Sequence, residues 1–144
     1  MSIEENKAII RRWLEEGWTN GNLSVADELI DPDFIAHVAG GQAVPSGPDG
    51  VRQIVTAWRT GFPDGRMVID DLIGVADKVV IRMTWRGTHQ GDFYGIAPTN
   101  RQVSVTSIGI DRVVNGKIVE GWGEVDMLGM YQQLGVIAAP GSAT

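Results

Sequence analysis

The sequence contains no cysteine and only two histidines among its 144 residues. The missing cysteines exclude disulfide bonds, thiolate nucleophiles and zinc or iron–sulfur sites that use thiolate ligands. The two histidines, His37 and His89, lie far apart in the sequence, and neither belongs to a metal-ligand motif, so we expect no metal site. Long hydrophobic runs are also missing. No segment approaches the roughly 20 apolar residues of a membrane-spanning helix, so no membrane partner is expected.

Positive charge is scarce, with 12 lysines and arginines against 18 aspartates and glutamates and a formal net charge of −6. No cluster of lysine and arginine offsets this balance, which argues against a nucleic-acid partner. The first residues, "MSIEENKAII", lack the apolar stretch and the small-residue cleavage site of a signal peptide. We therefore expect a cytoplasmic protein of one domain, residues 1–144, that handles a small molecule or another protein.

Helical periodicity dominates the first part of the chain. Ser2 and Glu5 form a capping-box signature that begins a helix of about 15 residues. A short second helix is expected over roughly 23–30, and a third follows Ser46, with Pro48 in its first turn. The segment 34–47, between the second and third helices, contains glycine and proline and is expected to be irregular or strand-like.

After Gly65 the hydrophobic period changes to about 2, which indicates strands. Strands are expected at roughly 67–75, 79–89, 102–114 and 117–125, with hairpin turns at 76–78 and Asn115–Gly116. Asp126 is expected to cap a short last helix that stops at Gly135, and residues 137–144 are expected to form a flexible tail. This order predicts an α+β fold in which three N-terminal helices enclose a pocket on one face of a curved antiparallel or mixed sheet.

Two motifs resemble those of the SnoaL-like polyketide cyclases, a family of the NTF2-like superfamily. They are "RGTHQGDFYGIAPTNRQV" at 86–103 and "GKIVEGWGEVDMLGMYQQLG" at 116–135. The resemblance extends from about Ile10 to Val136 and implies a cone-shaped fold with a deep pocket between sheet and helices. It also implies an enzyme of secondary metabolism that needs no cofactor and closes a ring on an aromatic polyketide by an aldol step. A homodimer or higher homo-oligomer is implied as well.

The sequence differs from the family at the two positions whose side chains would transfer the proton. The family's catalytic aspartate follows the position of Trp122, which here is Gly123, and its partner histidine would fall on Gly109. Glycine cannot transfer a proton, so the aldol mechanism is not carried over. Proton transfer to or from carbon, hydroxylation assisted by the enol of the substrate, and activities like those of epoxide hydrolases or ketosteroid isomerases remain alternatives. A carrier for an apolar ligand, without catalysis, is a further alternative.

The turn at Asn115–Gly116 allows two registers of the last hairpin. A strict two-residue turn pairs Gly109 with Trp122, whereas a type I turn with a bulge at Gly116 pairs Gly109 with Gly121. We prefer the second register because it places the family's histidine and aspartate positions on one face. That face would carry Ser107, Gly109, Asp111, Val119, Gly121, Gly123 and Val125. The opposite face would carry Ile108, Ile110, Arg112, Ile118, Glu120, Trp122, Glu124 and Asp126. The small residues indicate either close packing or a wider pocket for a flat ligand.

Four side chains are candidate catalytic acids or bases: His37, His89, Asp111 and Glu124. Asp111 lies on the predicted pocket face, where burial beside apolar walls would raise its pKa and suit it to general base catalysis. His89 would either act in catalysis or hold the loop 90–98 by hydrogen bonds. His37 occupies a position at which family members often carry a histidine, and Glu124 is the acid nearest to the lost aspartate, although it would otherwise face solvent.

Aromatic side chains suit a flat polycyclic substrate because ring faces stack with an offset. Trp18 aligns with a pocket aromatic of the cyclases, whereas the other tryptophans are also suited to the core. Arg82 is expected either to pair with Asp70 or Asp71 or to face a ligand carbonyl. The expected substrate-binding set is Trp18, Trp58, Arg82, Tyr94, Ser107, Gly109, Gly121, Trp122 and Gly123. In a dimer formed through the outer sheet face, Ile108, Ile110 and Trp122 would be buried between subunits.

Overall fold

The computed structural model describes residues 2–38, 44–138 and 141. The first helix, α1 (Ile3–Arg12), passes directly into a π-helical segment, η1 (Trp13–Thr19). The Ser2 hydroxyl accepts a hydrogen bond from the Glu5 backbone N–H at 3.1 Å, and the Glu5 carboxylate accepts one from the Ser2 N–H. The predicted capping box is therefore confirmed. Within the described residues, no helix has the length and apolar character needed to cross a membrane.

The second and third helices flank a strand. Helix α2 (Val25–Leu29) is shorter than expected, because the chain enters strand β1 (Ile30–Val38) immediately after it. Helix α3 (Gly47–Gly61) begins after Ser46 with proline in its first turn, as predicted. The expected irregular or strand-like segment 34–47 is strand as far as Val38, and its residues 39–43 lie outside the described residues.

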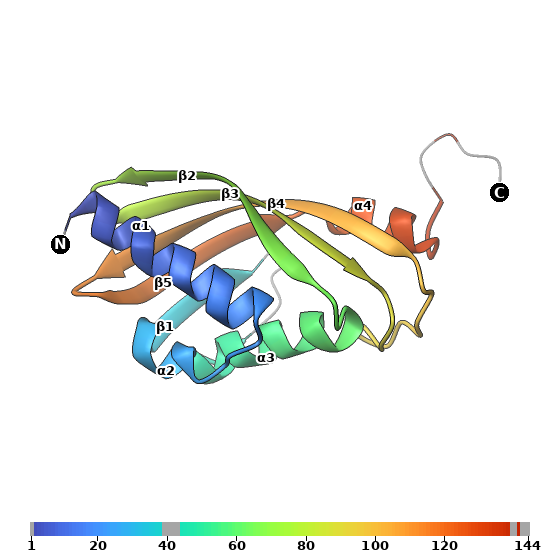
Figure 1. The fold of residues 1–144 in the computed structure, drawn as a ribbon, viewed down its shortest axis with the longest axis horizontal. Helices are drawn as coiled ribbons and strands as arrows, with labels where there is room; N and C mark the ends of the chain where they lie inside the picture. The colour runs from blue at the N-terminus through green and yellow to red at the C-terminus, as the bar shows by residue number, and fades with distance from the viewer. Residues whose placement is uncertain (1, 39–43, 139–140, 142–144) are drawn as a thin grey trace.

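The remaining strands follow in sequence order: β2 (Arg66–Val75), β3 (Lys78–Thr88), β4 (Gln102–Val114) and β5 (Lys117–Val125). They form the predicted antiparallel meander, and β1 adds to it in parallel beside β5, so that the sheet order is β1-β5-β4-β3-β2. Helices α1, α2 and α3 lie on one side of this curved sheet (Figure 1). The α+β plan with N-terminal helices covering a mixed sheet is thus confirmed.

The predicted register of the β4–β5 hairpin is wrong. Asn115 and Gly116 both have positive φ, 50° and 79°, and form a strict two-residue turn between the paired residues Val114 and Lys117. The extra residue enters further along β5, where the pairing shifts by one residue at Val119. This bulge within the strand places Gly109 opposite Gly123, not opposite Gly121 or Trp122.

Apart from Ile118 and the bulged Val119, the predicted grouping of residues by face survives the change of register. Burial alternates along β4, with Val103, Val105 and Ser107 buried on the side of the helices, which we call the inner face. Asp111 lies opposite Gly121 on this face, and Gly109 opposite Gly123. Ile118, expected on the outer face, is buried on the inner one because it precedes the bulge.

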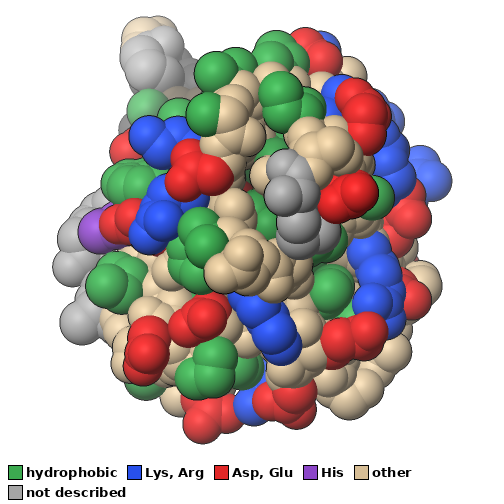
Figure 2. Space-filling model, turned by 90° about the vertical axis from the view of Figure 1, so that its left-hand side faces the viewer, with side chains coloured by type: hydrophobic (Ala, Val, Ile, Leu, Met, Phe, Trp, Pro, Cys, Tyr) green, Lys and Arg blue, Asp and Glu red, His purple; other side chains and the backbone are tan. Residues whose placement is uncertain are grey.

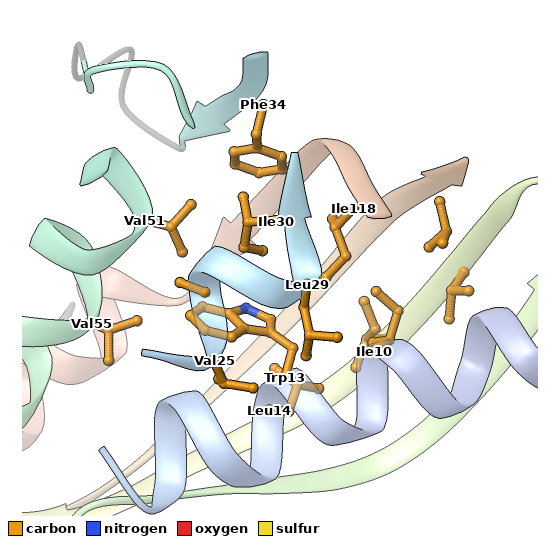
Figure 3. Packing of buried hydrophobic residues seen from close by; sticks show 14 residues of the cluster. Ile10, Trp13, Leu14, Val25, Leu29, Ile30, Phe34, Val51, Val55 and Ile118 are labelled. Carbon is orange, nitrogen blue, oxygen red and sulfur yellow. The ribbon is translucent and has the colours of Figure 1, made fainter. Parts of the chain in front are cut away.

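Two hydrophobic clusters fill the space between helices and sheet. In the first, Ile10, Trp13 and Leu14 of α1 and η1 pack with Leu29 and Ile118 toward the end of the sheet at which the hairpins turn (Figure 3). The second is aromatic and lies toward the other end; its buried members are Trp58, Phe62, Trp85, Phe93, Val103, Val105, Met130 and Leu134.

The chain ends in the short helix α4 (Met127–Leu134). The Asp126 carboxylate accepts a hydrogen bond from the Gly129 N–H at 2.9 Å, and Gly135 ends the helix with a φ of 78°, so both predicted caps are confirmed. Of the expected flexible tail, only residues 137, 138 and 141 are described. Viewed from the end that carries the N-terminus, acidic and basic side chains are interspersed with hydrophobic ones (Figure 2).

Candidate active site

Asp111 places a carboxyl group on the inner face of the sheet. Its neighbours across the strands are Gly121 on β5 and the fully buried Val79 on β3. Burial raises the pKa of the Asp111 carboxyl to about 7. In the part of the chain that the structure describes, no donor forms a hydrogen bond with this carboxyl to oppose that rise. A half-buried carboxyl that titrates near neutral pH can both take and return a proton.

The three inner-face glycines differ in what lies above them. A Cβ atom built on Gly121 would lie 2.5 Å from the Asp111 Oδ1 atom and 3.3 Å from the Cζ atom of Phe34. One built on Gly109 would lie 3.0 Å from the Trp122 carbonyl oxygen and 3.5 Å from the Met83 Cε atom. Above Gly123, no atom of residues 2–38, 44–138 or 141 lies within 4 Å. Close packing therefore accounts for Gly109 and Gly121, whereas none of the described side chains packs over Gly123.

Ser107 adds a hydroxyl group to the same face of β4. It is 8% exposed and lies next to Met83 and Val125 of the neighbouring strands. It lies four positions before Asp111 in the sequence, which corresponds to about 14 Å along a strand. The inner face thus presents a hydroxyl and a carboxyl on either side of the paired glycines Gly109 and Gly123.

His89 is fully buried and holds the loop that follows β3. Its Nδ1 atom accepts a hydrogen bond from the Thr99 N–H at 3.2 Å and lies 3.0 Å from the Thr99 hydroxyl. Backbone hydrogen bonds to Arg101 and from Asn100 fasten the same residue. Accepting at Nδ1 leaves the proton on Nε2, which is buried without a partner among the described residues. These contacts are those expected for the loop-holding alternative.

His37 and Glu124 lie on the outer face, away from Asp111. His37 Nε2 is 2.9 Å from Glu120 Oε2, and its ring stacks on Trp122. This hydrogen bond, followed by that of Arg112, lowers the pKa of Glu120. Glu124 is exposed opposite Ile108. The structure therefore does not bring the four candidate catalytic residues together, because strand alternation places two of them on the opposite side of the sheet.

Arg82 also lies on the outer face. Its guanidinium donates a hydrogen bond of 3.4 Å to the backbone oxygen of Asp70, whose carboxylate accepts one from the Thr84 hydroxyl at 2.6 Å. With Glu124 and Asp126, these residues line an open hollow of about 570 Å³, to whose lining Met83, Ser107 and Val125 also belong. Among the described residues, Arg82 thus forms no ion pair with the carboxylate of Asp70 or Asp71.

The aromatic candidates divide between the core and the surface. Trp18 and Trp58 pack edge to face with each other and with Trp85, at centroid distances of 5.8–6.3 Å. Tyr94 is 52% exposed on the loop after β3, and Trp122 is 37% exposed on the outer face. Trp18 and Trp58 therefore border the inner face, and Trp122 does not.

Phe34 is a site residue that sequence reasoning missed. It is 7% exposed on β1, and its ring covers Gly121 beside the Asp111 carboxyl. Phe34, Ala36 and Val38 are apolar residues at alternate positions, a pattern typical of a strand with one buried face. The sequence does not indicate that this strand pairs with β5, and without that pairing Phe34 cannot be placed near Asp111.

The chain is similar to a known protein family and to two cyclases of named substrate. Residues 8–134 match the model of the family described as SnoaL-like polyketide cyclase. The aklanonic acid methyl ester cyclase AcmA of Streptomyces galilaeus is 31% identical over 135 residues, which cover 92% of each protein. The nogalonic acid methyl ester cyclase of Streptomyces nogalater is 27% identical over 119 residues, covering 82% of this chain and 89% of that protein.

Solved structures share the fold. The crystal structure of AclR, a proposed hydroxylase from Streptomyces galilaeus, superposes with a TM-score of 0.84 at 28% identity, covering 96% of this chain and 85% of that one. Proteins described by two different reactions thus resemble this chain at similar levels of identity. Similarity therefore does not identify the reaction, which has to be inferred from the side chains on the inner face.

Proposed function

Because this chain belongs to the SnoaL-like polyketide cyclase family, we propose that it is an enzyme that moves a proton to or from carbon in a polyketide-like ketone. Asp111 is the general acid–base of this reaction. The observation that carries the proposal is a half-buried carboxyl on the inner face whose pKa is raised to about 7. A base of this kind is best suited to work near neutral pH.

The reaction begins at a carbon that lies next to a carbonyl group. The Asp111 carboxylate removes a proton from this carbon, the C–H electron pair enters the carbonyl group, and an enolate forms. The resulting carboxylic acid then returns the proton to the enolate, at carbon or at oxygen. Loss of this proton is the first step of an aldol ring closure and also of a hydroxylation that uses the enol of the substrate, so the proposal does not depend on which of them follows.

The substrate is expected to be flat and polycyclic. The space above Gly123, the partner of Gly109 across the strands, suits a ring system that lies against the sheet. Ser107, on the far side of these glycines from Asp111, can donate a hydrogen bond to a second oxygen of the substrate. Aklanonic acid methyl ester, named in the description of a relative, is therefore the first compound to test.

The test follows exchange of the carbon-bound proton. The protein is incubated with aklanonic acid methyl ester in deuterated buffer, and deuterium uptake and any ring-closed product are measured by mass spectrometry. We expect Asp111→Asn to slow the exchange by about 10²–10⁴-fold, the usual contribution of a general acid–base. Glu124→Gln, an acid-to-amide change on the outer face, is the matched control. Exchange at the wild-type rate in Asp111→Asn would overturn the assignment.

A carrier of an apolar ligand is the second candidate. The glycines at 109 and 123 favour it, because the family's acid and base positions carry no side chain. Saturable binding of the same ester without deuterium uptake, equal in wild type and Asp111→Asn, would support the carrier and exclude the enzyme.

A further inference from the structure

The Asp111 carboxyl occupies space that a side chain at position 121 would normally fill. The two residues are direct partners across β4 and β5 and lie on the inner face. In such pairs the Cβ atoms are usually about 4.5–5.5 Å apart, and each side chain stands over its own strand. Here the Asp111 Oδ1 atom lies 2.5 Å from the point where a Cβ of residue 121 would stand. The carboxyl therefore leans across onto β5.

Phe34 borders the same space from the other side. The tip of its ring lies 3.3 Å from the point at which the Cβ of residue 121 would stand, and the ring itself is buried. The half-buried carboxyl thus lies beside both bare backbone and an aromatic edge, which limit its contact with water. Removal from water disfavours the charged form of a carboxyl group.

We propose that Gly121 is a positioning residue: because it lacks a side chain, it lets the Asp111 carboxyl lie against β5 beside the Phe34 ring, in the place from which the proposed proton transfer occurs. The inference rests on the proposed function for its catalytic meaning, but the placement itself can be tested without any substrate. It also gives the glycine a role different from that of Gly109, where backbone is the nearest neighbour.

A methyl group at position 121 should displace the carboxyl without breaking the sheet. The nearest described atoms to such a group belong to the side chains of Asp111 and Phe34, and none is backbone. Rotation of the Asp111 carboxyl toward solvent relieves the contact. Once hydrated, the carboxyl should titrate closer to the ordinary aspartate value of about 3.9.

Titration of Asp111 by carboxyl ¹³C NMR tests this directly. We expect the midpoint for Asp111 to fall from about 7 in the wild-type protein toward the ordinary aspartate value in Gly121→Ala. Gly123→Ala is the matched control, since it adds the same methyl group to the same face of the same strand, where no described atom lies within 4 Å. Its Asp111 midpoint should not move. An unchanged midpoint in Gly121→Ala would overturn the proposal.

A double-mutant cycle keeps the proposal testable if Gly121→Ala does not fold. In Asp111→Ala, the atom that bars a side chain at 121 is gone, so adding Gly121→Ala should cost much less stability than it does in the wild-type background. Urea unfolding measures this coupling. Equal cost in the two backgrounds, or failure of the double variant to fold while Asp111→Ala folds, would show that Asp111 is not what the glycine accommodates.

The two proposals fail in different ways. If Asp111→Asn keeps the wild-type exchange rate while Gly121→Ala lowers the Asp111 midpoint, the catalytic role is wrong and the positioning role stands. If Asp111→Asn abolishes exchange and the midpoint does not move in Gly121→Ala, the catalytic role stands and the positioning role is wrong.

Discussion

His37 of β1 stacks on Trp122 of β5, with ring centroids 5.0 Å apart and ring planes 11° apart. Both side chains lie on the outer face, where His37 is also hydrogen-bonded to Glu120. The imidazole therefore joins the edge strand to its neighbour from the side of the sheet opposite to Asp111.

This placement predicts that outer-face acid–base groups do not take part in catalysis. We expect His37→Ala and Glu124→Gln each to leave kcat within about twofold of the wild-type value, a change of at most about 0.4 kcal/mol in the barrier. Steady-state rates with the substrate found by deuterium exchange provide the measurement. A hundredfold loss in either variant would mean that the reaction takes place on the outer face.

Stability should depend on pH through Asp111. Because burial raises its folded-state pKa to about 7, the folded protein holds a proton that the unfolded chain releases at about pH 3.9. Stability from this group is therefore complete below pH 3.9 and is lost as the pH rises to about 7. We expect Asp111→Asn to unfold at a higher temperature than the wild-type protein at pH 8, and at the same temperature at pH 4. Thermal unfolding at both pH values measures the difference. A lower unfolding temperature for the variant at pH 8 would contradict it.

Gly123→Val should separate binding from folding. No described atom lies within 4 Å of the added Cβ, and valine favours strands more than glycine does, by up to about 1 kcal/mol. We expect unfolding in urea to require the same or a higher urea concentration, while the affinity for a polycyclic ester falls at least about tenfold as the open space is filled. Calorimetric titration measures the affinity. Equal affinity would place the ligand elsewhere.

His89→Ala should loosen the loop between β3 and β4. The change removes a fully buried ring and leaves the Thr99 N–H without its acceptor, so we expect a loss of about 2–4 kcal/mol in the free energy of unfolding. Urea unfolding gives the value, and protease cleavage within residues 90–100 reports on the loop itself. Gln90→Ala, at an exposed neighbouring position, is the control and should behave like the wild-type protein. Cleavage at the wild-type rate in His89→Ala would contradict the loop-holding role.

The outer face should mediate self-association. Ile108, Ile110 and Trp122 are 54%, 36% and 37% exposed on adjacent strands and form an apolar surface that a second copy can cover. We expect a dimer by sedimentation at micromolar concentration, and a monomer after Ile108→Lys. A wild-type monomer under these conditions would exclude this role for the surface.

Sequence periodicity was sufficient for most of the fold. The strands β2 to β5 lie within a residue or two of their expected bounds, because alternation of buried and exposed residues is a local property. The bulge at Val119 was not predictable in the same way, since no glycine marks it and the flanking residues alternate acceptably in either register. The pairing of Gly109 was therefore predicted wrongly.

Only the part of the candidate site that lies on the β4–β5 hairpin was predictable from the sequence. Alternation along β4 is enough to place Asp111 on the inner face, and the structure agrees. The position of Phe34 and the outward direction of His37 both depend on β1 pairing with β5, which no local pattern specifies. For this reason the contribution of β1 to the site, Phe34, could not be predicted from the sequence.

That parallel pair also has a consequence for how the protein is made. Strand β1 emerges early from the ribosome, but among the described strands its one hydrogen-bonded neighbour is β5, the last to be synthesised. The pairing of β1 must therefore wait until translation is nearly complete. Chains released before residue 117 would lack this closing strand, and they should be the species that a cell's chaperones and proteases capture.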